Sequence, residues 1–215
     1  MKLFHHYKNK PYTYIGLARH SETLEEMVIY ETRYENAHGK IWVRPKKMFF
    51  ESIELNGKST PRFKEIPLNI STTVDVKEAD INVIAPLIEK TFGEWDSKWF
   101  YSTFNQNKKF HLAIANIEDQ PVGFKIGYER DQSEFYSWLG GVLPEYRGLG
   151  VAAKLMTTQH EWCQRQGYLK IGTKTQNRFK EMLMLNIKNG FEIIGTDPTD
   201  KDGMKILMEK KINGN

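Results

Sequence analysis

Residues 140–154 read Gly140-Gly-Val-Leu-Pro-Glu-Tyr-Arg-Gly-Leu-Gly-Val-Ala-Ala-Lys154 and lead from an apolar strand, through a proline turn, into the start of a helix. Gly148 and Gly150 carry no Cβ, so they let the main chain approach a ligand closely. The first turn of a helix holds unpaired N–H groups and the positive end of the helix dipole, which attract phosphate oxygens. We therefore predict that this turn binds a pyrophosphate. It is not a Walker loop, because no Gly-Lys-Ser/Thr follows.

Three strand candidates precede this turn: Phe110–Asn116, Val122–Arg130 and Glu134–Leu143. Short polar connections join them, which favours an antiparallel meander. A helix to about Gln166 separates Glu134–Leu143 from the next strand, Tyr168–Thr175, so these two strands should be parallel neighbours joined by a right-handed crossover. The other predicted elements are a strand at Ile70–Val74, a helix that Asp75 caps with Glu78 three residues on, helices at Asp96–Lys108 and Arg178–Lys188, and strands at Phe191–Thr196 and Met204–Lys211.

The first third of the chain has a different texture. Residues 1–66 alternate short segments rich in Tyr, Trp, Phe and Val with turn clusters, which favours a small all-β unit. Residues 1–70 hold 12 Lys+Arg against 8 Asp+Glu, whereas residues 71–215 hold 19 of each. From these changes in pattern and charge we predict two domains, residues 1–68 and residues 69–215.

Length and composition are those of an ordinary globular protein and exclude a disulfide scaffold. The first ten residues lack the apolar core of a secretory signal, and the longest charge-free apolar run, Phe135–Pro144, is too short to span a membrane. Cys163 is the single cysteine, and six scattered histidines give no metal-ligand spacing. We therefore expect a cytoplasmic protein with no metal and no membrane partner.

The spacing Arg147-x-x-Gly150-x-Ala152 matches the acyl-CoA signature Arg/Gln-x-x-Gly-x-Gly/Ala, and residues 70–212 resemble the GNAT acyltransferase superfamily. Asn186-Ile-Lys-Asn-Gly-Phe191 is similar to a second motif of that family, in which a helix ends at Gly-Phe before the next strand. The resemblance implies a mixed α+β GNAT fold, with a mixed central sheet flanked by helices. It also implies acetyl-CoA as the acyl donor and a small-molecule or protein amine as the acceptor.

The same resemblance implies which residues bind acyl-CoA. Main-chain amides of the turn are expected to hold the pyrophosphate, from Arg147, Gly148, Leu149, Gly150, Val151 and Ala152. Val142 and Leu143, at the strand end, are expected to pair with the pantetheine amides through their main chain. Asn177, which opens the next helix, is expected to line the far side of the cleft.

Attack of a neutral amine on a thioester needs a base for the amine and an acid for the departing thiolate. Glu134 stands 13 residues before Arg147, a separation like that of the catalytic glutamate in histone-acetylating relatives, so we predict it as the base. A solvent-facing strand-end carboxylate is the alternative. Many relatives carry a tyrosine acid at the position of Asn186; asparagine cannot give up a proton, so it could only orient the thiolate or the acyl oxygen. The acid role is left to Tyr168 or water.

Within residues 1–66, the segments Val28-Ile-Tyr30, Trp42-Val-Arg-Pro45 and Met48-Phe49 resemble a small bacterial domain family of unknown function with a compact barrel. The resemblance implies a small SH3-like β-barrel and no activity. Its aromatic and basic residues could stack on the bases and contact the phosphates of RNA. A solvated face above an aromatic core is the interpretation we favour.

We expect an acyl-CoA-dependent N-acyltransferase, most simply an acetyltransferase, whose N-terminal module selects or positions the acceptor. The alternative is a catalytically silent acyl-CoA-binding or adaptor protein, because the usual tyrosine is missing at Asn186. The sequence leaves the oligomeric state open, with a homodimer among the options.

Overall fold

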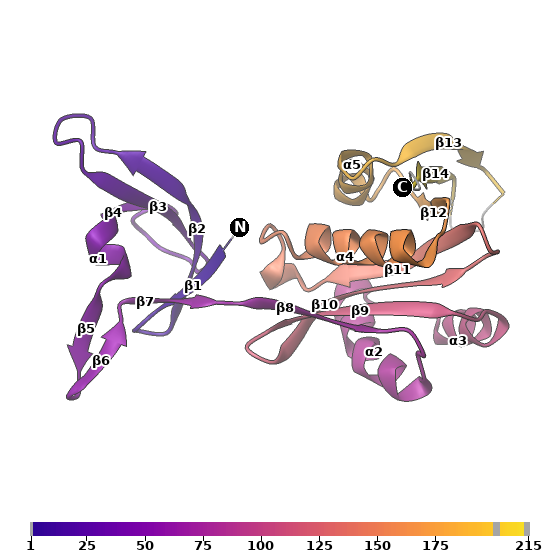
Figure 1. The fold of residues 1–215 in the computed structure, drawn as a ribbon, viewed down its shortest axis with the longest axis horizontal. Helices are drawn as coiled ribbons and strands as arrows, with labels where there is room; N and C mark the ends of the chain where they lie inside the picture. The colour runs from indigo at the N-terminus through magenta and orange to yellow at the C-terminus, as the bar shows by residue number, and fades with distance from the viewer. Residues whose placement is uncertain (1, 200–202, 213–215) are drawn as a thin grey trace. The chain divides into compact units, whose positions relative to one another are not determined.

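A computed structural model describes residues 2–199 and 203–212 of the chain (Figure 1). The chain divides into two compact units, Met1–Leu68 and Asn69–Asn215. Each unit has its own sheet and its own buried core. No helix in the described residues is long and apolar enough to cross a membrane.

The N-terminal unit is built on an open, antiparallel five-stranded sheet with the order β4-β3-β2-β1-β7. Its elements are β1 (Lys2–His6), β2 (Lys10–Arg19), β3 (Glu26–Thr32), β4 (Ile41–Pro45), α1 (Lys46–Phe50), the hairpin β5 (Ser52–Leu55) and β6 (Lys58–Pro61), and β7 (Phe63–Ile66). Aromatic side chains fill its core, where the rings of Phe49 and Phe63 stack with centroids 4.1 Å apart. Stacked and edge-on ring pairs of this kind add to the stability that burial of the rings provides.

The closed SH3-like barrel expected for this unit is not found among the described residues. Strands β4 and β7 are the two edges of the sheet and do not pair with each other. Helix α1 and the β5–β6 hairpin lie between β4 and β7 along the chain. Strands β5 and β6 pair with each other and form a separate two-stranded sheet. The residues between β4 and β7 therefore form a helix and a separate hairpin, and they do not connect the two edges of the sheet.

The C-terminal unit contains a mixed seven-stranded sheet with the order β13-β14-β12-β11-β10-β9-β8. Its strands are β8 (Leu68–Thr73), β9 (Phe110–Ile117), β10 (Gln120–Glu129), β11 (Glu134–Val142), β12 (Lys170–Thr175), β13 (Glu192–Asp197) and β14 (Lys205–Lys211). Its helices are α2 (Glu78–Phe92), α3 (Ser97–Gln106), α4 (Val151–Gln166) and α5 (Lys180–Lys188), with a single 3-10 turn, η1, at Pro144–Tyr146. The predicted order of elements and the parallel pairing of β11 with β12 are confirmed.

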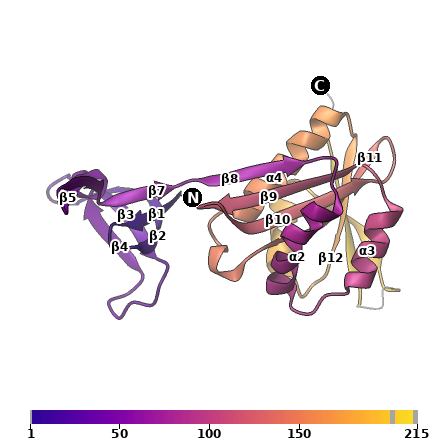
Figure 2. The same ribbon diagram turned by 90° about the horizontal axis from the view of Figure 1, so that it is seen from below.

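Helices cover both faces of this sheet (Figures 1 and 2). On one face, α2 and α3 pack a cluster that includes Ile81, Ile84 and Ile88, spaced as one stripe of a helix. On the other face, α4 and α5 share a second cluster with β12 and β14. The predicted cap of α2 is wrong: the helix begins after Lys77, whose main-chain N–H donates to the carboxylate of Asp80 at 2.8 Å.

The middle of the sheet opens between β11 and β12. The two strands pair over Glu134–Tyr136 and Lys170–Gly172, while β11 continues to Val142. The pairing of β11 with β10 shifts by one residue, because Ile126 faces Leu139 whereas Tyr128 faces Tyr136. This irregularity is a β-bulge in β11, and a bulge bends the strand that carries it. Beyond Tyr136, β11 therefore parts from β12 and leaves one edge without a strand partner.

Candidate functional site

A cavity of about 610 Å³ lies beside the unpaired half of β11. Its walls come from the end of α2, from β10 and β11, from the first turns of α4 and from the start of α5. Its lining residues include Thr91, Lys125, Gly141, Val142, Arg147 and Ala152. A cavity of this size accommodates a small-molecule ligand, which sites of about 300 to 1,000 Å³ typically bind.

Gly141 shows how tightly the cavity wall is built. A Cβ atom at this position would lie 2.7 Å from Cγ2 of Thr91 on α2, a distance at which one of the two groups has to move. The glycine thus lets the end of β11 pass directly under α2. Thr91 itself lines the cavity, and its buried hydroxyl has no hydrogen-bond partner among the described residues.

The turn into α4 has the open form that the sequence predicts. Gly148 and Gly150 have φ angles of 77° and 81°, in the left-handed region where glycine is favoured. Gly150 is the N-cap of α4, no side chain caps the helix there, and a Cβ on it would meet nothing within 4 Å. The first N–H groups of α4 have no acceptor within the helix. They are therefore available to an anion.

The predicted pyrophosphate residues divide into two sets. Arg147 and Ala152 line the cavity, and Arg147 Nε also donates to the main-chain oxygen of Val142 at 3.2 Å, which ties the turn to the strand end. The others lie in the turn but do not line the cavity: Gly148 and Gly150 are exposed, and Leu149 and Val151 are buried.

Val142 and Leu143 differ in what their main chains can offer. The N–H of Leu143 donates to Val122 O at 2.9 Å, and its oxygen accepts from Tyr146 N at 2.9 Å, so both groups are already used. Because main-chain groups alternate along an antiparallel strand, those of Val142 point to the opposite edge, toward the gap. The predicted pairing with a pantetheine arm is therefore wrong for Leu143, and it stays a prediction for Val142.

Asn177 is not where the prediction requires it. Helix α5 begins at Lys180, so Asn177 lies in the exposed turn before the helix and does not line the cavity. The next two residues do line it, and the guanidinium of Arg178 lies 4.9 Å from the ring centre of Phe179. The far wall is thus formed by a cation and an aromatic ring rather than by the predicted amide.

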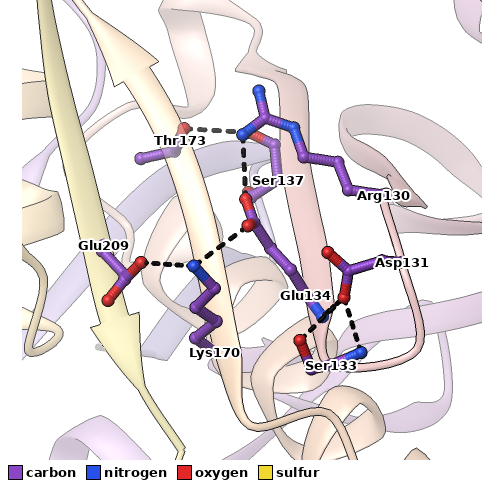
Figure 3. Close-up of polar contacts among 8 residues, drawn as sticks. All are labelled: Arg130, Asp131, Ser133, Glu134, Ser137, Lys170, Thr173 and Glu209. Atoms are coloured by element: carbon purple, nitrogen blue, oxygen red, sulfur yellow. Dashed lines mark hydrogen bonds and ion pairs between the residues drawn. The ribbon is translucent and has the colours of Figure 1, made fainter.

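Glu134 does not line the cavity, and its polar contacts lie with Arg130 and Lys170 (Figure 3). Its carboxylate, at the start of β11, accepts from Arg130 Nη1 at 2.8 Å and lies 3.1 Å from Lys170 Nζ. Lys170 in turn pairs with Glu209 at 3.0 Å, which links β11, β12 and β14. The structure therefore places Glu134 in an ion-pair network at the paired end of β11 and β12, and not beside the cavity as a base would need to be.

Asn186 and Tyr168 are also outside the cavity. Asn186 is 3% exposed, and its amide nitrogen lies 3.6 Å from the sulfur of Met208. The hydroxyl of Tyr168 donates to Glu129 at 2.8 Å, and burial together with this hydrogen bond raises the pKa of the tyrosine. Neither residue is placed to give a proton to a thiolate in the cavity.

Lys125 is the cavity residue that sequence reasoning missed. It lies in the middle of β10, is 8% exposed and has no hydrogen-bond or ion-pair partner in the part of the chain that the structure describes. Burial lowers the pKa of its ammonium from 10.5 to about 8. The signal was present in the sequence, because a lysine interrupts the apolar run Val122–Ile126 of a central strand.

No group of three or more His, Cys, Asp or Glu residues within the described ranges is arranged to hold a metal ion. Cys163 is buried and free. Burial raises the pKa of its thiol to about 12, so it stays protonated at neutral pH.

Comparisons with known proteins give two family matches. A model described as the acetyltransferase (GNAT) family matches residues 81–180, and a model described as a protein of unknown function (DUF1653) matches residues 2–65. No curated protein sequence matches the chain.

Solved structures share the fold of the C-terminal unit at low sequence identity. The ribosomal-protein-S18-alanine N-acetyltransferase of Escherichia coli is 16% identical with a TM-score of 0.58, and the match covers 68% of this chain and 96% of that one. Ard1 of Thermoplasma volcanium is 18% identical with a TM-score of 0.57, and the match covers 67% of this chain and 98% of that one. Arabidopsis thaliana Naa50, in complex with the bisubstrate analogue CoA-Ac-MVNAL, is 20% identical with a TM-score of 0.54. The match covers 66% of this chain and 99% of that one. These similarities establish the fold.

Proposed function

We propose that this chain, which carries a GNAT acetyltransferase domain at residues 81–180 and a DUF1653 domain at residues 2–65, transfers an acyl group from acyl-CoA to an amine. Acetyl is the group we expect, with acetyl-CoA as donor. The observation that carries the proposal is the cavity beside the unpaired edge of β11, with the open turn of α4 at its wall.

The residues present fit an acyl-CoA molecule. The turn at Gly148 and Gly150 and the first N–H groups of α4 would hold the pyrophosphate, and Arg147 adds a positive charge beside them. The N–H of Val142, which points into the gap, would pair with an amide of the pantetheine arm, as a strand partner would.

The reaction we propose is direct attack of a neutral amine on the thioester carbonyl carbon. A new carbon–nitrogen bond forms, the carbon–sulfur bond breaks, and its electron pair leaves with the sulfur. The Naa50 comparison structure contains an analogue in which CoA, an acetyl group and a peptide are joined, so that fold brings a donor and a peptide acceptor together. By analogy we propose a protein or small-molecule amine as the acceptor here.

We assign the N-terminal unit to selecting or positioning that acceptor. In support, it has its own sheet and aromatic core, and its matched family covers residues 2–65 separately from the GNAT match. We further propose a cytoplasmic protein, on the argument that its one cysteine cannot form an internal disulfide.

Isothermal titration with acetyl-CoA tests the donor site, and release of free thiol across a panel of amines tests the transfer. The panel would hold peptides with different N-terminal residues, a lysine-containing peptide and a polyamine. Saturable binding with amine-dependent thiol release is the expected result. Absence of binding at millimolar acetyl-CoA would contradict the proposal.

A catalytically silent acyl-CoA-binding protein is the second candidate. It is favoured by the placement of Glu134 and Asn186, because neither lines the cavity. Binding of acetyl-CoA with no thiol release above the blank from any amine would support it.

A further inference from the structure

Lys125 is a buried cation without an anion. It lies on β10 in the wall of the cavity, and 8% of its surface is exposed. A buried charge is strongly unfavourable unless it is paired. No carboxylate among the described residues forms an ion pair with it, so an anionic group of a ligand in the cavity would supply a partner for this ammonium.

The titratable groups near Lys125 on β9 and α4 are neutral or cationic at neutral pH. His111 of β9 and His160 of α4 have pKa values lowered to about 4 and about 3, in both cases chiefly by burial. Cys163 of α4 keeps its proton, as described above, and His160 also contacts the ammonium of Lys210, at 3.1 Å. None of these groups can neutralise Lys125.

The groups on the cavity side are mostly cationic too. The charged residues that line the cavity with Lys125 are Arg147, Arg178, Lys180 and Glu181. Glu181, the one carboxylate in this set, is an exposed residue in the first turn of α5 and forms no ion pair with Lys125. An anionic group of a ligand therefore meets a largely positive wall.

We propose, on the basis of the acyltransferase function proposed above, that Lys125 gives a proton to the thiolate that leaves acyl-CoA. The amine nitrogen attacks the carbonyl carbon, the carbon–sulfur bond breaks, and the electron pair on sulfur takes a proton from Lys125 Nζ. CoA leaves as a thiol and Lys125 is left as a neutral amine. The proton that the acylated nitrogen loses returns through water to Lys125, so the cycle is balanced.

Position favours the sulfur over the phosphates as the partner of Lys125. Lys125 pairs with Gly140 of β11, two residues before Val142. The turn that would hold the pyrophosphate follows the end of this strand. A pantetheine arm that runs back along β11 from the turn would therefore bring its sulfur end, and not its phosphates, toward Lys125.

This assignment fills the role that Asn186 leaves empty. Asn186 faces Met208 in the core, and Tyr168 is held by Glu129 outside the cavity. The pKa of about 8 keeps Lys125 protonated at neutral pH and still lets it lose a proton readily to a thiolate. Burial in the cavity wall would thus make this lysine a competent acid.

A readout that needs no acceptor tests the contact directly. The thiol of bound CoA is titrated by the ultraviolet absorbance of its thiolate, in the wild type and in Lys125→Met. We expect the bound thiol to ionise at lower pH than free CoA in the wild type, and at or above the free value in Lys125→Met. Lys108→Met, which removes an exposed lysine outside the cavity, is the matched control and should behave like the wild type.

Turnover gives the second readout. With an amine that the wild type acetylates, Lys125→Met should lower turnover by about 100-fold or more and abolish the fall of the rate above about pH 8. Lys125→Gln, which keeps a polar group at the site, serves as a second variant and should show the same loss.

The outcomes separate the two proposals. A wild type that neither binds acetyl-CoA nor releases thiol refutes the acyltransferase function itself. A wild type that is active, with an unshifted thiol titration and undiminished turnover in Lys125→Met, overturns the role of Lys125 alone. If Lys125→Met weakens binding of succinyl-CoA but leaves acetyl transfer unchanged, the ammonium of Lys125 binds a carboxylate on the acyl group. The proposed role of Lys125 as an acid is then wrong.

Discussion

Lys170 Nζ lies 3.1 Å from Glu134 Oε2, across the short stretch in which β11 and β12 pair. Just beyond it, Thr173 Oγ1 donates to Ser137 O at 2.8 Å, and from there the strands part (Figure 3). The ion pair therefore closes one end of the gap that the cavity borders. A carboxylate used in this way stabilises the shape of the site without taking part in the chemistry.

Glu134→Gln tests this structural role. Glutamine keeps the size of the side chain but loses the charge that Arg130 and Lys170 face, so we expect the free energy of unfolding to fall by about 1 kcal/mol. The pH–rate profile should keep its shape. Urea unfolding and thiol-release rates across pH measure the two effects. A lower turnover that recovers at high pH would instead support Glu134 as the base.

Gly150→Glu tests the anion site at α4. The carboxylate would occupy the site at the start of α4 where main-chain N–H groups would bind a phosphate, and it would repel that phosphate. We therefore expect acetyl-CoA affinity to fall by at least about tenfold. Because φ at Gly150 is 81°, any side chain there adds backbone strain. Gly150→Asn is the control, since asparagine tolerates this conformation and carries no charge. Equal affinities of the two variants by titration calorimetry would contradict the assignment.

Asn186→Ala separates structure from chemistry at the second predicted catalytic residue. The amide is buried against Met208 and away from the cavity, so its loss should lower the melting temperature. We expect kcat/KM to stay within about twofold of the wild type, since no transition-state contact is removed. A fall of kcat/KM by about 100-fold in a folded variant would restore Asn186 to the reaction.

The sequence predicted the features that depend on local pattern. The order of elements follows from hydrophobic periodicity, and the turn without Cβ atoms at Gly148 and Gly150 follows from the residue type. What it could not predict is where side chains point once strands and helices pack. Glu134 and Asn186 lie in the expected elements, yet one is paired with cations and the other is buried in the core.

Long-range pairing explains the remaining differences. Barrel closure in the N-terminal unit would need β4 and β7 to meet, and no local pattern encodes that contact. Lys125 was visible as a charge within an apolar strand. Its lack of a partner became evident only when β9, α4 and the cavity wall were in place around it.

His111 makes the protein sensitive to acid. Burial holds its pKa at about 4, so the folded state keeps it neutral while the unfolded chain binds a proton below about pH 6.5. Stability is therefore lost as pH falls through this window, by about 2 kcal/mol from this residue at pH 5. His111→Phe should show a shallower decline in urea unfolding between pH 7 and pH 5. An unchanged slope would mean that the other buried histidine, His160, dominates.

Lys125→Met should make the protein more stable while it slows the reaction. The pKa of Lys125 is about 8 in the folded state against 10.5 when exposed, so charging it in the fold costs about 3 kcal/mol. This cost is fully present below about pH 8 and is relieved as pH rises toward 10.5, because the unfolded chain then carries the extra proton. Methionine fills the site without a charge, so the gain in unfolding free energy over the wild type should be largest at pH 7 and shrink by pH 10. Urea unfolding at both pH values measures it, with Lys108→Met as the control that should show neither effect. A gain that does not change with pH would mean that packing, and not the buried charge, sets the difference.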